Sequence, residues 1–339
     1  MYRKPVLLLL VTIMMSITFQ SSARAGLSNE LSECAAIIPD NMRMKCYDDL
    51  AITGVGSIGA VEDTGLEKEA APTLRVTIKN RLEKYDRMKA FKMAPYRPSY
   101  VLPVSYNKSR NSKPWQALEP GIELDDTEVK FQLSMQYKLA DDLFWGNGDF
   151  WFGYTQLAFW QLYNSDTSSP FRDTNYEPEG FFTFRTNWNI LGLTNNAVTV
   201  GFNHQSNGRA EPLSRSWNRV YAEFFLQRGN FTMILKPWYW FDEDEDDLDN
   251  PNMDGYIGHG QINFLYAFKN VLLNAKWRNN FDFRSEEDNH GSIQLDIAFP
   301  LYHGLKGYVQ YFSGYGESLV DYNVTSETIG LGIIMANWM

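Results

Sequence analysis

An alternation of apolar and polar residues with a period of two constrains this chain most strongly. From about residue 98 to the C-terminus, segments of roughly ten residues show this alternation and are separated by turn-rich loops. Successive side chains of a strand point to opposite faces, so each segment has one apolar and one polar face. The clearest segments are Val129–Leu139, Ile293–Phe299 and Ile329–Met335. The pattern predicts an all-β fold.

Two all-β architectures satisfy this pattern, a soluble sandwich and a transmembrane antiparallel β-barrel. Aromatic residues make up 15% of the chain although its mean hydropathy is only -0.37. A barrel with an apolar outside, a polar inside and aromatic girdles requires that combination. Beyond residue 25 there is no apolar run of about 18 residues, which excludes a helical membrane protein. The net charge of -10, without a basic face, argues against nucleic acid as a partner.

The N-terminal residues predict export of the protein. Residues 1–25 resemble a secretory signal peptide, with Arg3 and Lys4 before an apolar stretch and Ala23-Arg24-Ala25 as the cleavage site. An exported chain enters an oxidising compartment. The only two cysteines, Cys34 and Cys46, are spaced for a local disulfide, and they lack the partners that a redox or metal site needs.

Residues 26–97 differ in composition from the segments that follow. We expect an N-terminal extension over 26–73, helical around the disulfide and ending in a flexible linker. The G-x-G-x-x-G match at Gly54–Gly59 has no strand before it and no helix after it, so it is not a dinucleotide site. Residues 74–97 form a basic amphipathic segment, which either packs on its neighbour or contacts an anionic membrane surface. The barrel is expected over 98–339.

Three polar residues interrupt the apolar faces of two adjacent predicted strands. His204 and Ser206 continue the phase of Val198, Val200 and Phe202, and Asn218 is in phase with Val220. A polar side chain directed at hydrocarbon is costly and marks a candidate functional site. Serine, histidine and asparagine could act as nucleophile, base and orienting group, and a neutral amide avoids the desolvation cost of a carboxylate. Spacing alone leaves open that they are ordinary strand-end residues at the membrane interface.

The same region resembles the active-site signature of bacterial outer membrane phospholipase A, a family of membrane-embedded esterases. The signature blocks are Asn203–Arg209, Pro212 and Ser214–Arg219. Further blocks in the same order are Tyr154–Gln156, Trp160-Gln161, Ser168–Arg172, Thr174–Pro178, Lys236–Tyr239, Ser313–Leu319 and Asp321–Asn323. The resemblance extends from about residue 74 to the C-terminus.

This resemblance implies a barrel of about twelve strands in the bacterial outer membrane, with the site on its outer wall near the outer leaflet. It implies hydrolysis of acyl esters of phospholipids and lysophospholipids (A1, A2 and lysophospholipase activities). Ser206 corresponds to the nucleophile, His204 to the general base, Asn218 to the residue that orients His204, and Gly208 to the oxyanion donor. The alternative is a porin-like barrel for binding or transport.

The family is calcium-dependent and active as a homodimer, which implies a shared Ca²⁺ site. Ser168 corresponds to a carbonyl ligand from one subunit, and the Arg209 carbonyl and Ser214 hydroxyl correspond to ligands from the other. Asp249 aligns with the family's second calcium carboxylate, and Gln156 with its interface glutamine. The acidic run at 242–247 is either part of a calcium site or a solvated loop.

Overall fold

The computed structural model describes residues 81, 83–85, 87–241, 250–284, 288–302 and 304–336. Contacts divide the chain into two units, Met1–Glu69 and Ala70–Met339, and all described residues belong to the second. The predicted signal peptide, the Cys34–Cys46 disulfide, the linker, Asp249 and the run at 242–247 lie outside the described residues. The predicted boundaries at residues 25, 73 and 97 therefore stay predictions.

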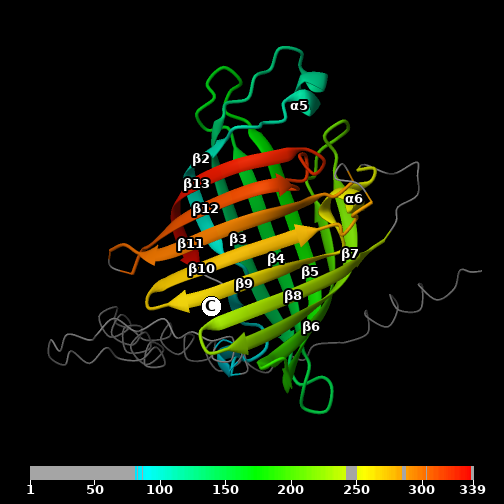
Figure 1. Ribbon diagram of the computed structural model, residues 1–339, viewed down its shortest axis with the longest axis vertical. Helices are drawn as coiled ribbons and strands as arrows, with labels where there is room; N and C mark the ends of the chain where they lie inside the picture. The colour runs from blue at the N-terminus through cyan, green and yellow to red at the C-terminus, as the bar shows by residue number, and fades with distance from the viewer. Residues whose placement is uncertain are drawn as a thin grey trace, which may run out of the picture. The chain divides into compact units, whose positions relative to one another are not determined.

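Twelve antiparallel strands, β2 to β13, form a closed barrel (Figure 1). Each strand pairs with the next along the chain, and β13 pairs with β2, which closes the sheet. The short strand β1 pairs with β3 beyond the end of β2, so β1 and β2 line one edge of β3 in succession. The predicted all-β barrel is confirmed, and the sandwich alternative is wrong. The strands are β1 (Met93–Pro95), β2 (Ser99–Asn107), β3 (Thr127–Ala140), β4 (Asp149–Trp160), β5 (Phe171–Ile190), β6 (Leu193–Ser206), β7 (Ser216–Arg228), β8 (Phe231–Trp240), β9 (Gly260–Phe268), β10 (Val271–Asn279), β11 (Gly291–Pro300), β12 (Lys306–Tyr315) and β13 (Thr325–Ala336).

Two short helices, α5 (Lys113–Leu118) and α6 (Met253–Ile257), lie in loops between strands. Across the described ranges, no helix combines the length and the apolar character needed to cross a membrane.

Long and short connections alternate along the chain and so collect at opposite ends of the barrel. The long loops follow β2, β4, β6, β8, β10 and β12, and they include both helices. The two-residue turn Leu191-Gly192 between β5 and β6 has positive φ at both positions, as a hairpin of the primed type I′ requires. Outer-membrane barrels place short turns in the periplasm and long loops outside the cell. Strand β6 therefore ends, at Ser206, on the long-loop side.

The two faces of the strands differ in polarity as the alternation predicts. On β3, Leu133 and Met135 are each 42% exposed on the outer face, whereas Lys130 and Lys138 are only 2% and 1% exposed and face the lumen. Gly330 of β13 also faces the lumen, where a β-carbon would come within 2.6 Å of Leu102 Cδ1. Aromatic residues occupy both faces, because Trp151, Phe181 and Tyr221 fill part of the interior.

Ion pairs fill the lumen. Lys130 pairs with Glu317 at 2.7 Å, Lys138 with Asp149 at 3.0 Å, and Arg172 with Glu128 at 3.0 Å. Lys130–Glu317 and Arg172–Glu128 join segments that are 187 and 44 positions apart, whereas Lys138–Asp149 joins the consecutive strands β3 and β4. Buried charges are tolerated where they are paired and hydrogen-bonded, so this network gives the barrel a packed polar core rather than an open channel.

Candidate active site

Strands β6 and β7 bring the predicted catalytic side chains to one patch of the outer wall. Phe202 and Val220 are exposed on that wall, and His204 and Asn218 follow them in the same phase. Asn203 and Arg219, one residue away on each strand, are buried on the luminal face. The period of two thus directs His204, Ser206 and Asn218 away from the lumen, where each is half-buried.

The strand register places His204 directly opposite Asn218. The distance between His204 Nδ1 and Asn218 Oδ1 is 2.9 Å. An amide oxygen can only accept a hydrogen bond, so Nδ1 carries the proton in this arrangement and Nε2 is left with its lone pair. The Asn218 side chain therefore selects the imidazole tautomer that can accept a proton from a nucleophile.

Ser206 lies two residues beyond His204 on β6, opposite Ser216 of β7. Within the part of the chain that the structure describes, the His204 ring is hydrogen-bonded to Asn218 and not to Ser206. A catalytic serine–histidine contact commonly tightens only when substrate is bound.

Asn207 organises the loop that follows Ser206, and the sequence analysis missed it. Its side chain is only 3% exposed and makes four hydrogen bonds. Asn207 Oδ1 accepts from the backbone N–H groups of Arg209 (3.3 Å) and Arg215 (3.0 Å). Asn207 Nδ2 donates to the Leu213 carbonyl (2.7 Å) and to Asp173 Oδ1 (3.3 Å). The sequence does contain one indication that Asn207 is buried, because residue 207 continues the inward-facing phase of residues 203 and 205.

The Asn207 hydrogen bonds give Gly208 its conformation. Gly208 has φ +62°, in the left-handed region where glycine is favoured. The N–H groups on either side of it are bonded, from Asn207 to the Arg215 carbonyl and from Arg209 to Asn207 Oδ1. No described residue accepts a hydrogen bond from the Gly208 N–H. That donor is available to a substrate next to Ser206.

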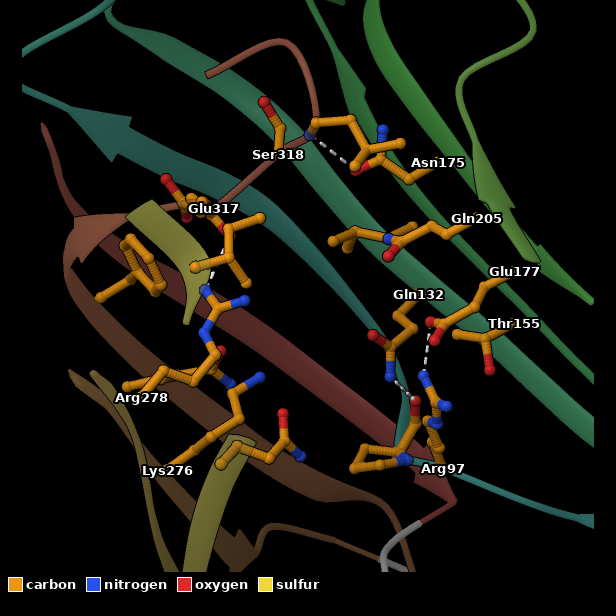
Figure 2. A pocket seen from close by; sticks show the side chains of 18 of the residues that line it. Arg97, Gln132, Thr155, Asn175, Glu177, Gln205, Lys276, Arg278, Glu317 and Ser318 are labelled. Atoms are coloured by element: carbon orange, nitrogen blue, oxygen red, sulfur yellow. Dashed lines mark hydrogen bonds and ion pairs between the residues drawn. The ribbon is translucent and has the colours of Figure 1, made fainter. Parts of the chain in front are cut away.

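The luminal side of the same wall is locked by charged hydrogen bonds. Glu177 of β5 accepts from Asn203 and from Arg219, at 2.9 Å in each case, and also pairs with Arg97 (Figure 2). Trp217 Nε1 donates to Gln205 at 2.8 Å. Each residue of β6 or β7 that neighbours a catalytic candidate is thus hydrogen-bonded on the luminal side of the wall, which limits the movement of His204 and Asn218.

The long loops pack behind the loop at 207–215. The Arg215 guanidinium lies over the Tyr322 ring, 5.7 Å from its centroid, and the Tyr322 hydroxyl donates to the Pro251 carbonyl at 3.0 Å. Burial raises the pKa of the Tyr322 phenol, so this donor stays protonated. His290 packs against Tyr256 and Tyr315 nearby, with Nδ1 3.0 Å from the Gly255 carbonyl oxygen, and this environment is structural.

The three described residues that are predicted to hold calcium lie in two loops at the same end of the barrel, whereas Asp249 lies outside the described residues. Ser168, with φ +57°, belongs to the turn between β4 and β5, and Arg209 and Ser214 belong to the loop between β6 and β7. Arg209 Nη2 donates at 2.5 Å to the carbonyl of Phe171, the first residue of β5, directly after the turn that holds Ser168. Among the described residues no backbone N–H or side-chain donor is bonded to the Ser168 or Arg209 carbonyl oxygen.

The donor chemistry of these loops fits a hard cation. Carbonyl and hydroxyl oxygens are ligands that Ca²⁺ accepts together with water. The described residues contain no group of three or more His, Cys, Asp or Glu side chains that could hold a metal ion. The described candidates Ser168, Arg209 and Ser214 offer backbone and hydroxyl oxygens.

Comparison with known proteins identifies close relatives over most of the chain. The sequence model of the family described as "Phospholipase A1" matches residues 76–335. Phospholipase A1 of Escherichia coli K12 is 35% identical over 280 residues, covering 82% of this chain and 93% of that protein. Phospholipase A1 of Proteus vulgaris is 34% identical over 288 residues, covering 84% and 96%.

Two solved structures share the barrel. Outer membrane phospholipase A from Escherichia coli has a TM-score of 0.68 at 35% identity, covering 74% of this chain and 94% of that one. The Salmonella typhi outer membrane phospholipase, a dimer with bound calcium, has a TM-score of 0.70 at 33% identity, covering 76% and 97%.

Proposed function

The chain belongs to the phospholipase A1 family and is an outer-membrane phospholipase, and we propose that it works through a Ser206-His204-Asn218 triad on the outer wall of its barrel. The observation that carries this proposal is the 2.9 Å contact between His204 Nδ1 and Asn218 Oδ1, two residues from Ser206 on an otherwise apolar surface. The substrates are phospholipids and lysophospholipids, and the bond broken is an acyl ester.

In this mechanism Ser206 Oγ attacks the acyl carbonyl carbon, and His204 Nε2 takes the hydroxyl proton. The Gly208 N–H donates to the oxygen that becomes negative. His204 then gives its proton to the departing alcohol oxygen, and water releases the fatty acid by the same steps in a second round. Asn218 holds the imidazole in the required tautomer.

The position of the site fits substrate entry from the membrane. Ser206 ends β6 on the long-loop side, which in outer-membrane barrels faces the cell exterior. The exposed neighbours Phe202 and Val220 suit contact with acyl chains. Phospholipids of the outer leaflet would reach Ser206 by lateral movement.

We further propose that the active form is a calcium-bound homodimer. Ser168 of one subunit and Arg209 and Ser214 of the other would hold Ca²⁺ through oxygen atoms. The ion would supply positive charge near the developing oxyanion. The calcium-bound dimer of the Salmonella typhi relative supports this arrangement. Gln156, half-buried on the outer face between Leu133 and Tyr176, would lie at the subunit contact.

A porin-like role is disfavoured because paired charges fill the lumen. The direct test is hydrolysis of micellar phospholipid with calcium or with EDTA. We expect wild type to be active with calcium, and Ser206→Ala to be inactive in both conditions.

Ser216→Ala is the matched control, because Ser216 is the cross-strand neighbour of Ser206 and loses the same hydroxyl group. Equal activity of Ser206→Ala and wild type would refute the triad. Equal activity of wild type with calcium and EDTA would refute the calcium dependence alone.

A further inference from the structure

A cavity of about 140 Å³ lies in the barrel lumen, on the opposite side of the wall from the catalytic site. Ten charged side chains line it, and the mechanism proposed above uses none of them. Six are basic and four are acidic: Arg97, Lys130, Arg219, Lys236, Lys276 and Arg278, with Glu177, Glu223, Asp296 and Glu317. Figure 2 shows Lys276 and Arg278 on one side of the cavity, and Arg97 and Glu177 on the other.

Every one of the four carboxylates already has strong partners. Glu177 is bonded to Arg97 and Arg219, and Glu223 to Lys236 at 3.0 Å. Glu317 accepts from Lys130 at 2.7 Å and from Thr328 at 2.6 Å. Asp296 is held by three side-chain amides, those of Asn274, Gln294 and Gln310.

Two of the six cations are left without a carboxylate. Lys276 forms no ion pair or hydrogen bond with any described residue, and Arg278 forms no ion pair with one. Arg278 donates only to neutral oxygens, from Nε to Ser292 Oγ (3.1 Å) and from Nη2 to the Tyr315 (3.2 Å) and Gly316 (2.8 Å) carbonyls. Its Nη1 has no acceptor among the described residues.

Lys276 and Arg278 also repel each other. They are two residues apart on β10 and face the same way, which puts their Cα atoms about 6.5–7 Å apart. Two like charges in a protein interior cost free energy unless an opposite charge accompanies them. The described carboxylates that line the cavity form no ion pair with either side chain, so a bound anion could supply an opposite charge within contact distance.

We propose that the lumen binds a small inorganic oxyanion, of the phosphate class, between Lys276 Nζ and Arg278 Nη1. A guanidinium and an ammonium on the same side of a cavity supply the donors that such an anion needs. Gln261, the cross-strand neighbour of Arg278, lines the same cavity and offers an amide donor. The bound anion would cancel the repulsion within β10 and stabilise the barrel.

The test measures thermal unfolding of the full-length protein in a zwitterionic detergent with EDTA, followed by tryptophan fluorescence. Sodium phosphate is titrated at constant ionic strength against sodium gluconate, whose anion is bulkier. The variants are Lys276→Met and, as the matched control, Lys269→Met, because Lys269 is exposed in the turn between β9 and β10.

We expect phosphate to raise the unfolding midpoint of wild type and of Lys269→Met with saturation. In Lys276→Met the half-saturating phosphate concentration should rise at least about tenfold. In gluconate alone Lys276→Met should be the more stable protein, because its β10 repulsion is gone. An equal phosphate response in all three proteins, or an equal response to phosphate and gluconate, would overturn the proposal.

A second measurement covers the case in which Lys276→Met does not fold. Phosphorus NMR of inorganic phosphate should show line broadening with wild-type protein and much less with Lys276→Gln. Equal line widths with wild type and with protein-free detergent would also refute the site.

Discussion

Replacing Asn218 by alanine tests how the proposed triad works, because it removes one hydrogen bond and leaves Ser206 and His204 in place. In the resting enzyme the lost contact is a neutral hydrogen bond of 2.9 Å on a half-buried surface. In the transition state the imidazole has taken a proton, and the same contact becomes charge-assisted. Such bonds contribute about 1.5–3 kcal/mol. At 1.36 kcal/mol for each factor of ten, the turnover rate should fall about 10- to 150-fold.

The comparison variant is His204→Ala, which removes the base itself. Loss of a catalytic base costs several orders of magnitude in turnover, so we expect a fall of at least about 10⁴-fold. Asn218→Asp keeps the acceptor oxygen and should be more active than Asn218→Ala. Its carboxylate would be charged at the membrane surface, which should lower the unfolding temperature of the protein.

The assay is the initial rate of phospholipid hydrolysis in mixed micelles at saturating calcium. Folding of each variant is checked by the heat-dependent mobility of the barrel on gels. If folded Asn218→Ala were as inactive as His204→Ala, asparagine would do more than orient the ring. If it kept wild-type activity, the 2.9 Å contact would be irrelevant to catalysis.

Three further predictions concern the loop, the dimer and the lumen. Asn207→Ala removes four hydrogen bonds from the loop that follows Ser206, so turnover should fall about tenfold or more. The calcium concentration that gives half-maximal activity should rise, and the barrel should stay folded on gels. An unchanged calcium concentration for half-maximal activity would contradict this role of Asn207. Calcium should promote self-association of protein whose Ser206 carries a sulfonyl group with an acyl chain, and sedimentation showing only monomer would argue against the shared site. Lys130→Ala should destabilise the barrel by about 3–5 kcal/mol, because Glu317 is left buried without its cation. Lys108→Ala, at an exposed position, should change stability little in the same unfolding assay.

Much of the fold could be predicted from the sequence, and so could the face of the sheet on which the candidate site lies. Both follow from alternation along a strand, which depends only on residues that are neighbours in sequence. Leu133 and Met135 face outward and Lys130 faces inward, as their phase predicts. The same phase directs Ser206 and His204 to the outer face. The number of strands depended on the family resemblance.

The sequence could not show which side chains meet across the barrel, because those contacts depend on strand register and on closure of the sheet. His204 contacts Asn218 only because β6 and β7 pair in one register. Asn207 is buried because its own loop folds back over it and Asp173 of β5 contacts it. A period of two carries no information about either contact.

Alternation along the chain determined by itself that this protein is built of β-strands, and which residues of a strand share a face, because side-chain direction depends only on neighbouring residues. The tertiary structure alone decided the partners of those residues. Lys130 reaches Glu317 across 187 positions, and Lys276 forms no ion pair with any described residue. Charge pairing depends on distances in space, and closure of the barrel sets those distances for residues that are remote in sequence.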